Sequence, residues 1–221
     1  DECNAPEFFS GAKLTLVGNG DKIDPTELKK SIQAEESRGV HGPQRGPISI
    51  TQITEKGQVY TLSEINEITE VAKEFNLPVH MDGARFANAL VSLGCTAAEM
   101  TWKAGVDVVS FGGTKNGLMG VEGVIFFDPQ KAWEFELRRK RAAHLFSKHR
   151  YLSAQMLAYL EHDLWIELAR KANSAASRLI AGLREIENVK FLVEPKANLI
   201  FASMPAYMHR KAFSKGLVYY T

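Results

Sequence analysis

The chain has 221 residues, of which 45% are hydrophobic and 24% are charged, and its formal net charge is +1. These values predict a globular protein with one large or two modest domains and a sizeable core. The charge is balanced and the basic residues are scattered, which argues against a polyanion such as nucleic acid as a partner.

The basic run "RRKR" at 138–141 is expected to form the solvated face of a helix. The chain contains two cysteines, Cys3 and Cys95, and neither a CxxC motif nor a Cys/His cluster of metal-ligand spacing. We therefore expect no metal site and a reduced, cytoplasmic location. No apolar stretch is long enough to span a bilayer, so we also expect no membrane partner.

Both ends of the chain have unusual features. It opens with Asp1 instead of Met, and it stops at "GLVYYT" (216–221), which has the composition of a strand. We expect a fragment that lacks both ends.

Two helix starts with capping signals lie in the first third of the chain. Asp24 precedes Pro25 and Glu27, which is typical of an N-cap followed by a first helical turn. Thr61 and Glu64 repeat the pattern as a capping box. The second helix places a stripe of apolar residues on one face: Ile65, Ile68, Val71, Ala72 and Phe75. This helix should therefore pack against a flat surface.

Apolar runs and helices alternate in the middle of the chain. "LPVHM" (77–81) precedes a helix that opens at Phe86 and is closed by Gly94, and a short capped helix follows within 96–105. "VDVVSFGG" (106–113) and "VEGVIFFD" (121–128) are expected to form two buried strands with a glycine-rich turn between them. This order predicts an α/β fold with a mostly parallel sheet flanked by helices.

From Pro129 onward the pattern changes. Helical patterns cover 130–146 and 151–187, and two alternating strand patterns follow at 189–195 and 198–205. We expect residues 1–160 to be part of a large domain, and residues 161–221 to begin a small α+β C-terminal domain.

Asp82 stands at the end of the apolar run 77–81, and Arg85 follows three residues later. Ligands of open α/β sheets collect at the carboxyl ends of strands. A buried carboxylate there needs a cationic or protonated partner, and Arg85 could be that partner in a purely structural pair. His80, within the same run, is expected to be a core histidine with satisfied hydrogen bonds.

The segment "SFGGTKNG" (110–117) contains Lys115. Its glycines would let the backbone approach a ligand closely, while Ser110 and Thr114 offer hydroxyls. Apolar strands on both sides would desolvate the amine and favour the neutral form that makes a Schiff base. The segment lacks the spacing of a P-loop, and no GxGxxG follows a strand, which disfavours both phosphate-binding motifs.

Asp82, Arg85 and Lys115 together suit pyridoxal phosphate. The aspartate would keep the pyridine nitrogen protonated, the lysine would hold the cofactor covalently, and the guanidinium would bind an amino acid carboxylate at two points.

The segments "VHMDGARFANALVSLG" and "VVSFGGTKNGLMGVEGVIFFDP" resemble the threonine aldolase and aromatic amino acid β-eliminating lyase family. Its members are pyridoxal phosphate enzymes with the aspartate aminotransferase-like fold, also called fold-type I. The resemblance implies that Lys115 is the Schiff base lysine, that Asp82 and Thr114 contact the cofactor, and that Arg85 binds the substrate carboxylate. It also implies that Arg150 faces the cofactor of a neighbouring subunit, and hence a homo-oligomer.

The family usually has a histidine stacked on the cofactor ring and a loop that holds the cofactor phosphate. Both would precede Asp1, so the general base is expected outside this chain, and the fragment alone could be inactive.

The expected function is an aldolase that cleaves L-threonine or related β-hydroxy-α-amino acids to glycine and an aldehyde. Two alternatives stay open: a β-eliminating lyase acting on aromatic or sulfur-containing amino acids, and a catalytically incompetent α/β scaffold.

Overall fold

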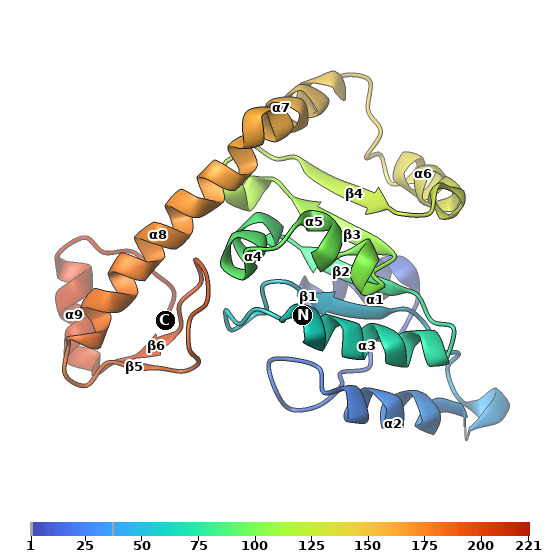
Figure 1. Ribbon diagram of the computed structural model, residues 1–221, viewed down its shortest axis with the longest axis horizontal. Coiled ribbons are helices and arrows are strands. Elements are labelled where there is room, and N and C mark those ends of the chain that lie inside the picture. Colours follow the sequence, from blue (N-terminus) through green and yellow to red (C-terminus); the bar gives the residue numbers. More distant parts are fainter. Residues whose placement is uncertain (1, 37) are drawn as a thin grey trace.

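A computed structural model describes residues 2–36 and 38–221 of the chain. At its centre is a four-stranded sheet in the order β1-β2-β3-β4 (Figure 1). The strands are β1 (Ile48–Thr51), β2 (Val79–Gly83), β3 (Val108–Gly112) and β4 (Glu122–Phe126). β1, β2 and β3 are parallel, and β4 pairs with β3 in the antiparallel direction. The expected α/β class with a mostly parallel sheet is confirmed.

Helices connect and follow the strands. They are α1 (Ala5–Ser10), α2 (Pro25–Glu36), α3 (Leu62–Glu74), α4 (Phe86–Leu93), α5 (Ala97–Met100), α6 (Ala132–Arg141), α7 (Arg150–Leu160), α8 (Leu164–Arg184) and α9 (Ala206–Ser214). α4 packs against β2, β3 and α8, whereas α2 packs on α3 at the side of the molecule away from α8 (Figure 1). A second, two-stranded sheet pairs β5 (Lys190–Phe191) with β6 (Ala202–Ser203) beside α8.

The capping signals in the sequence form as expected. The Glu27 amide donates to Asp24 Oδ1 at 2.9 Å ahead of α2. At α3, Thr61 and Glu64 form a reciprocal capping box. The stripe on α3 is buried at Ile65, Ile68 and Ala72, while Val71 and Phe75 pack partly buried against the same core. Gly94 ends α4 in a left-handed conformation, with φ of 65°. These local predictions are confirmed.

Strand alternation gives the central sheet two different faces. One face is apolar and buried, and its members include Ile50, Val79, Met81, Val109 and Phe111. The other face carries Ser49, His80, Asp82 and Ser110, which are less buried, because successive side chains of a strand point to opposite sides. Asp82 pairs with Thr51 on one side and Ser110 on the other. The polar face therefore places these residues in neighbouring strands.

Two expectations about strands are wrong. β4 was expected to be buried, but Val124 and Ile125 are 41% and 40% exposed. Among the described residues, β4 has a neighbouring strand on one side only, and its contact with α6 involves the rings of Phe126 and Phe135, whose centroids are 5.3 Å apart. The terminal segment 216–221 was expected to be a strand and has no regular structure.

Other boundaries differ from the sequence patterns. The helical pattern over 151–187 is interrupted by the 3-10 turn η6 (Glu161–Asp163), where His162 and Asp163 have positive φ. The two C-terminal strands shrink to two residues each. Strand β1 and helix α9 were not predicted, although the alternation "ISIT" could have indicated β1. Within the described residues, no helix is both long and apolar enough to cross a membrane.

Candidate active site

Asp82 lies near the carboxyl end of β2, where the three parallel strands end together. Its side chain is half-buried, and Oδ1 accepts a hydrogen bond from the Ala84 amide at 2.9 Å. No described residue donates to Oδ2. The carboxylate is thus held in orientation by one oxygen and leaves the other available at the strand ends.

Arg85 follows directly, as the N-cap residue of α4. Its side chain is half-buried, and among residues 2–36 and 38–221 it forms no ion pair with Asp82 or any other carboxylate. A purely structural Asp82–Arg85 pair, which the sequence left open, is not formed. The backbone turn at Ala84 satisfies Asp82 instead.

Lys115 lies in the 3-10 turn η4 (Thr114–Asn116), three residues after β3 ends. Gly112 brings this turn against the Asp82–Arg85 segment, since a Cβ at Gly112 would lie only 2.4 Å from the Ala84 carbonyl oxygen. The glycine was expected to admit a ligand. In the structure, the missing side chain of Gly112 instead allows the Ala84 backbone to approach, which brings the Lys115 turn and the Asp82–Arg85 segment together.

Lys115 was expected to be desolvated by apolar strands on both sides, but the described residues of this chain do not bury it. Lys115 and Thr114 are exposed, because the turn projects beyond the strand ends. Glu122, at the start of β4, accepts hydrogen bonds from the Gly113 amide at 3.2 Å and the Thr114 amide at 3.1 Å. The backbone of the turn is held by these bonds, while the lysine side chain is exposed.

A buried polar network on the inner side of the turn was missed by sequence reasoning. Asn116 Nδ2 donates to the Tyr159 hydroxyl at 2.6 Å and to the Trp165 carbonyl oxygen at 2.9 Å. The Tyr159 hydroxyl donates in turn to the Gly112 carbonyl oxygen at 3.4 Å. Tyr159 is fully buried in α7 and lies 43 residues from Asn116, so no local sequence pattern could reveal the pairing.

His80 lies on the same face of β2 as Asp82. Its two ring nitrogens are 2.9 Å from Ser49 Oγ and 2.9 Å from Ser110 Oγ, so the imidazole links all three parallel strands. Burial lowers the pKa of His80, and the nearby Asp82 carboxylate partly opposes this. The histidine is satisfied, as expected, but by serines on the polar face of the sheet and not within the apolar core.

Arg150 is exposed at the first turn of α7, with its guanidinium 5.4 Å from the ring centroid of Tyr151. Tyr159, which touches the lysine turn, lies nine residues later, or about 14 Å along the helix axis. α7 lies on the β4 side of the sheet, away from β1 (Figure 1). The structure therefore does not bring Arg150 to the Lys115 turn of its own chain.

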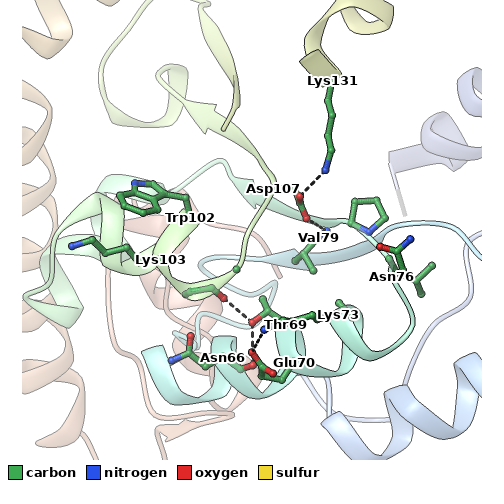
Figure 2. A pocket seen from close by; sticks show the side chains of 15 residues that line it. Asn66, Thr69, Glu70, Lys73, Asn76, Val79, Trp102, Lys103, Asp107 and Lys131 are labelled. Atoms are coloured by element: carbon green, nitrogen blue, oxygen red, sulfur yellow. Dashed lines mark hydrogen bonds and ion pairs between the residues drawn. The ribbon is translucent and has the colours of Figure 1, made fainter. Parts of the chain in front are cut away.

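A groove of about 740 Å³ lies at the opposite edge of the sheet, where β2 and β3 begin. Figure 2 shows Asp107 between Val79 and Lys131 in its wall, and Oδ1 of Asp107 accepts from Lys131 Nζ at 3.0 Å. Oδ2 accepts from the Val79 amide at 2.9 Å. The groove contains none of the residues predicted for the site, and its Asp107 is already paired.

The beta-eliminating lyase family model matches residues 1–205. Over 223 aligned residues, the chain is 42% identical to the low specificity L-threonine aldolase of Pseudomonas sp. (strain NCIMB 10558) and 39% identical to that of Pseudomonas aeruginosa. All of this chain is aligned, and it spans 64% of the length of each relative.

Among solved structures, the threonine aldolase of Leishmania major superposes with a TM-score of 0.85 at 24% identity, covering 92% of this chain and 59% of that one. This similarity supports the fold. Because the family match covers most of the sequence, including the Asp82 and Lys115 segments, the chain belongs to the beta-eliminating lyase family.

Proposed function

We propose that the complete protein is a pyridoxal phosphate-dependent carbon-carbon lyase that cleaves L-threonine or related β-hydroxy-α-amino acids to glycine and an aldehyde. The observation that carries this proposal is the convergence of Asp82, Arg85 and Lys115 on neighbouring segments at the carboxyl edge of a parallel sheet. The relatives named low specificity L-threonine aldolase, at 42% and 39% identity, direct the choice of substrate.

The residues present fit the cofactor chemically. Asp82 has one carboxylate oxygen without a donor among the described residues, and both Arg85 and Lys115 are without an ion-pair partner there. Paired groups would have to break existing interactions before binding a ligand. These three can engage an anionic cofactor and an amino acid substrate without that cost.

Each residue has a distinct task in this proposal. Bound pyridoxal phosphate supplies a conjugated pyridine ring that accepts the electron pair of the Cα–Cβ bond. Asp82 holds a proton on the ring nitrogen through its free oxygen, and the Lys115 amine anchors the cofactor through its aldehyde carbon. Arg85 binds the substrate carboxylate, and Thr114 offers an exposed hydroxyl beside the lysine.

The assignment is tested by adding pyridoxal phosphate to the complete protein, recording visible absorbance, then reducing with borohydride and mapping the labelled peptide. We expect the label on Lys115. A label on another lysine contradicts the site, and the absence of any visible band favours the catalytically incompetent scaffold.

β-Elimination is the second candidate, because the matching family model is described as beta-eliminating lyase. The products distinguish the two reactions. Glycine with an aldehyde indicates the aldolase, whereas pyruvate with ammonia indicates elimination.

We also propose a homo-oligomer located in the cytoplasm, with Arg150 directed to the cofactor of a neighbouring subunit. The position of Arg150, about 14 Å along α7 from Tyr159, supports a role outside its own site. The domain boundary is proposed at residues 160–161, where α7 gives way to η6.

A further inference from the structure

The turn that carries Lys115 is bonded on both sides of the lysine. On its inner side, the Tyr159 hydroxyl contacts Gly112, three residues before Lys115, and Asn116, one residue after it. On its outer side, Glu122 accepts from the amides of Gly113 and Thr114. Every residue from 112 to 116 except Lys115 itself is thereby tied to Tyr159 or Glu122.

The contact between Tyr159 and the turn lies in the buried core of the protein. Tyr159 is fully buried, and its ring lies 6.0 Å from Phe111, the residue before Gly112. Burial raises the pKa of Tyr159, with the Asn116 hydrogen bond opposing, so the hydroxyl stays protonated and can donate to Gly112. Asn116 uses both hydrogens of its amide, one to Tyr159 and one to Trp165.

We propose that Tyr159 and Glu122 are positioning residues for Lys115. They fix the backbone of the turn so that the lysine amine is presented at the carboxyl edge of the sheet, beside Asp82. This inference rests on the proposed function, in which Lys115 holds the cofactor. A reacting amine must start from a defined backbone, because errors of about 1 Å in position can cost about a hundredfold in rate.

The test uses Tyr159→Phe in the complete protein. The substitution keeps the buried ring and removes only the hydroxyl, leaving Gly112 and Asn116 without that partner. We expect the apo protein to link pyridoxal phosphate to Lys115 at least about tenfold more slowly, measured by visible absorbance and borohydride trapping. We expect kcat to fall while KM for L-threonine changes less than about twofold, because Arg85 is untouched.

Thr69→Val is the matched control. The Thr69 hydroxyl is also buried and donates to a backbone carbonyl, Ala104, at 2.7 Å, but it lies at the opposite edge of the sheet. The control should lose comparable stability and link the cofactor at the parent rate. If both variants slow linkage equally, or if Tyr159→Phe links at the parent rate, the positioning role of Tyr159 is wrong.

Glu122 gives a second test that does not depend on a buried substitution, since its side chain is exposed. Glu122→Ala should also slow linkage, and Glu122→Gln should restore part of the rate because its amide oxygen can still accept a hydrogen bond. If Glu122→Ala links the cofactor at the parent rate, the positioning role of Glu122 is wrong.

The unsubstituted protein separates this inference from the function on which it rests. If borohydride labels Lys115 there but the variants behave like the parent, only the positioning roles fail. If it labels another lysine, the proposed function fails first.

Discussion

At the scale of single residues, Asp82, Arg85 and Lys115 share one property: among the described residues, none of their charged groups has an ion-pair partner. Asp107, at the other edge of the sheet, is in contrast bonded through both oxygens. The unpaired groups lie at the edge where an α/β sheet binds ligands.

Asp82→Asn tests whether the charge of this residue is needed. Asparagine can still accept the Ala84 hydrogen bond through its amide oxygen, so the fold should persist. It cannot keep a pyridine nitrogen protonated, so we expect kcat to fall about a hundredfold or more, while cofactor still binds. Steady-state kinetics of the complete protein measure this, and near-parent turnover would leave Asp82 with the structural role of orienting Ala84.

Arg85→Lys tests two-point binding of the substrate carboxylate. An ammonium group cannot reproduce the fork of a guanidinium, so we expect KM to rise about ten- to hundredfold, equivalent to about 1.4–2.7 kcal/mol. The visible spectrum of the bound cofactor should be unchanged. Loss of the cofactor or of folding would instead show that Arg85 is structural.

His80 should make stability depend on pH. Burial holds the folded-state pKa of His80 below the usual 6.5, so below that pH the unfolded chain binds a proton that the folded chain excludes. Stability is therefore expected to fall as the pH drops through 6.5 and towards the folded-state pKa. Urea unfolding on either side of pH 6.5 should show a smaller pH effect in His80→Gln than in the parent. An equal effect in both would mean that other groups cause it.

At the scale of elements, the sequence carries its strongest signals at helix starts. The Thr61 hydroxyl accepts from the Glu64 amide at 3.2 Å, and the Glu64 carboxylate accepts from the Thr61 amide at 2.7 Å, which satisfies the amide of the N-cap and one amide of the first turn of α3. α3 carries Ile65 and Ile68, both fully buried, into the core.

Thr61→Ala removes the side-chain half of this cap. We expect the free energy of unfolding to fall by about 1 kcal/mol, measured by urea denaturation. Thr61→Ser retains the hydroxyl and should stay close to the parent. Equal losses in both variants would show that the threonine methyl group matters more than the cap.

At the scale of the whole molecule, α7 links two parts of the proposed chemistry. Its first residue, Arg150, is exposed, and Tyr159 near its other end is buried against the lysine turn. If Arg150 serves a neighbouring subunit, α7 connects two active sites. Tyr159 supports the Lys115 turn of its own subunit, and Arg150 reaches the cofactor of the next subunit.

Mixing two inactive variants tests this arrangement. Arg150→Ala and Lys115→Ala chains should each be inactive alone, while a mixed dimer would contain one site with both intact residues. With random exchange, half of the dimers are mixed and half of their sites are intact, so activity should return to about a quarter of the parent value. No recovery after demonstrated subunit exchange would mean that Arg150 does not act across subunits.

The sequence by itself determined the features that depend on near neighbours. Side chains within a few residues of each other determine the caps at Asp24 and Thr61, the end of α4 at Gly94 and the strand that contains Asp82. The segments around Asp82 and Lys115 also resemble the family, and the match of the family model over residues 1–205 confirms this resemblance.

Only the tertiary structure decided what depends on residues far apart in the chain. An apolar run does not reveal whether its strand will be central or at an edge, so β4 was wrongly expected to be buried. The Tyr159–Asn116 bond and the contact of Gly112 with Ala84 join segments that the local pattern treats as separate. The sequence identified Lys115 as a candidate site residue. The hydrogen bonds that fix the backbone of its turn depend on packing between elements, and no short window of sequence contains that information.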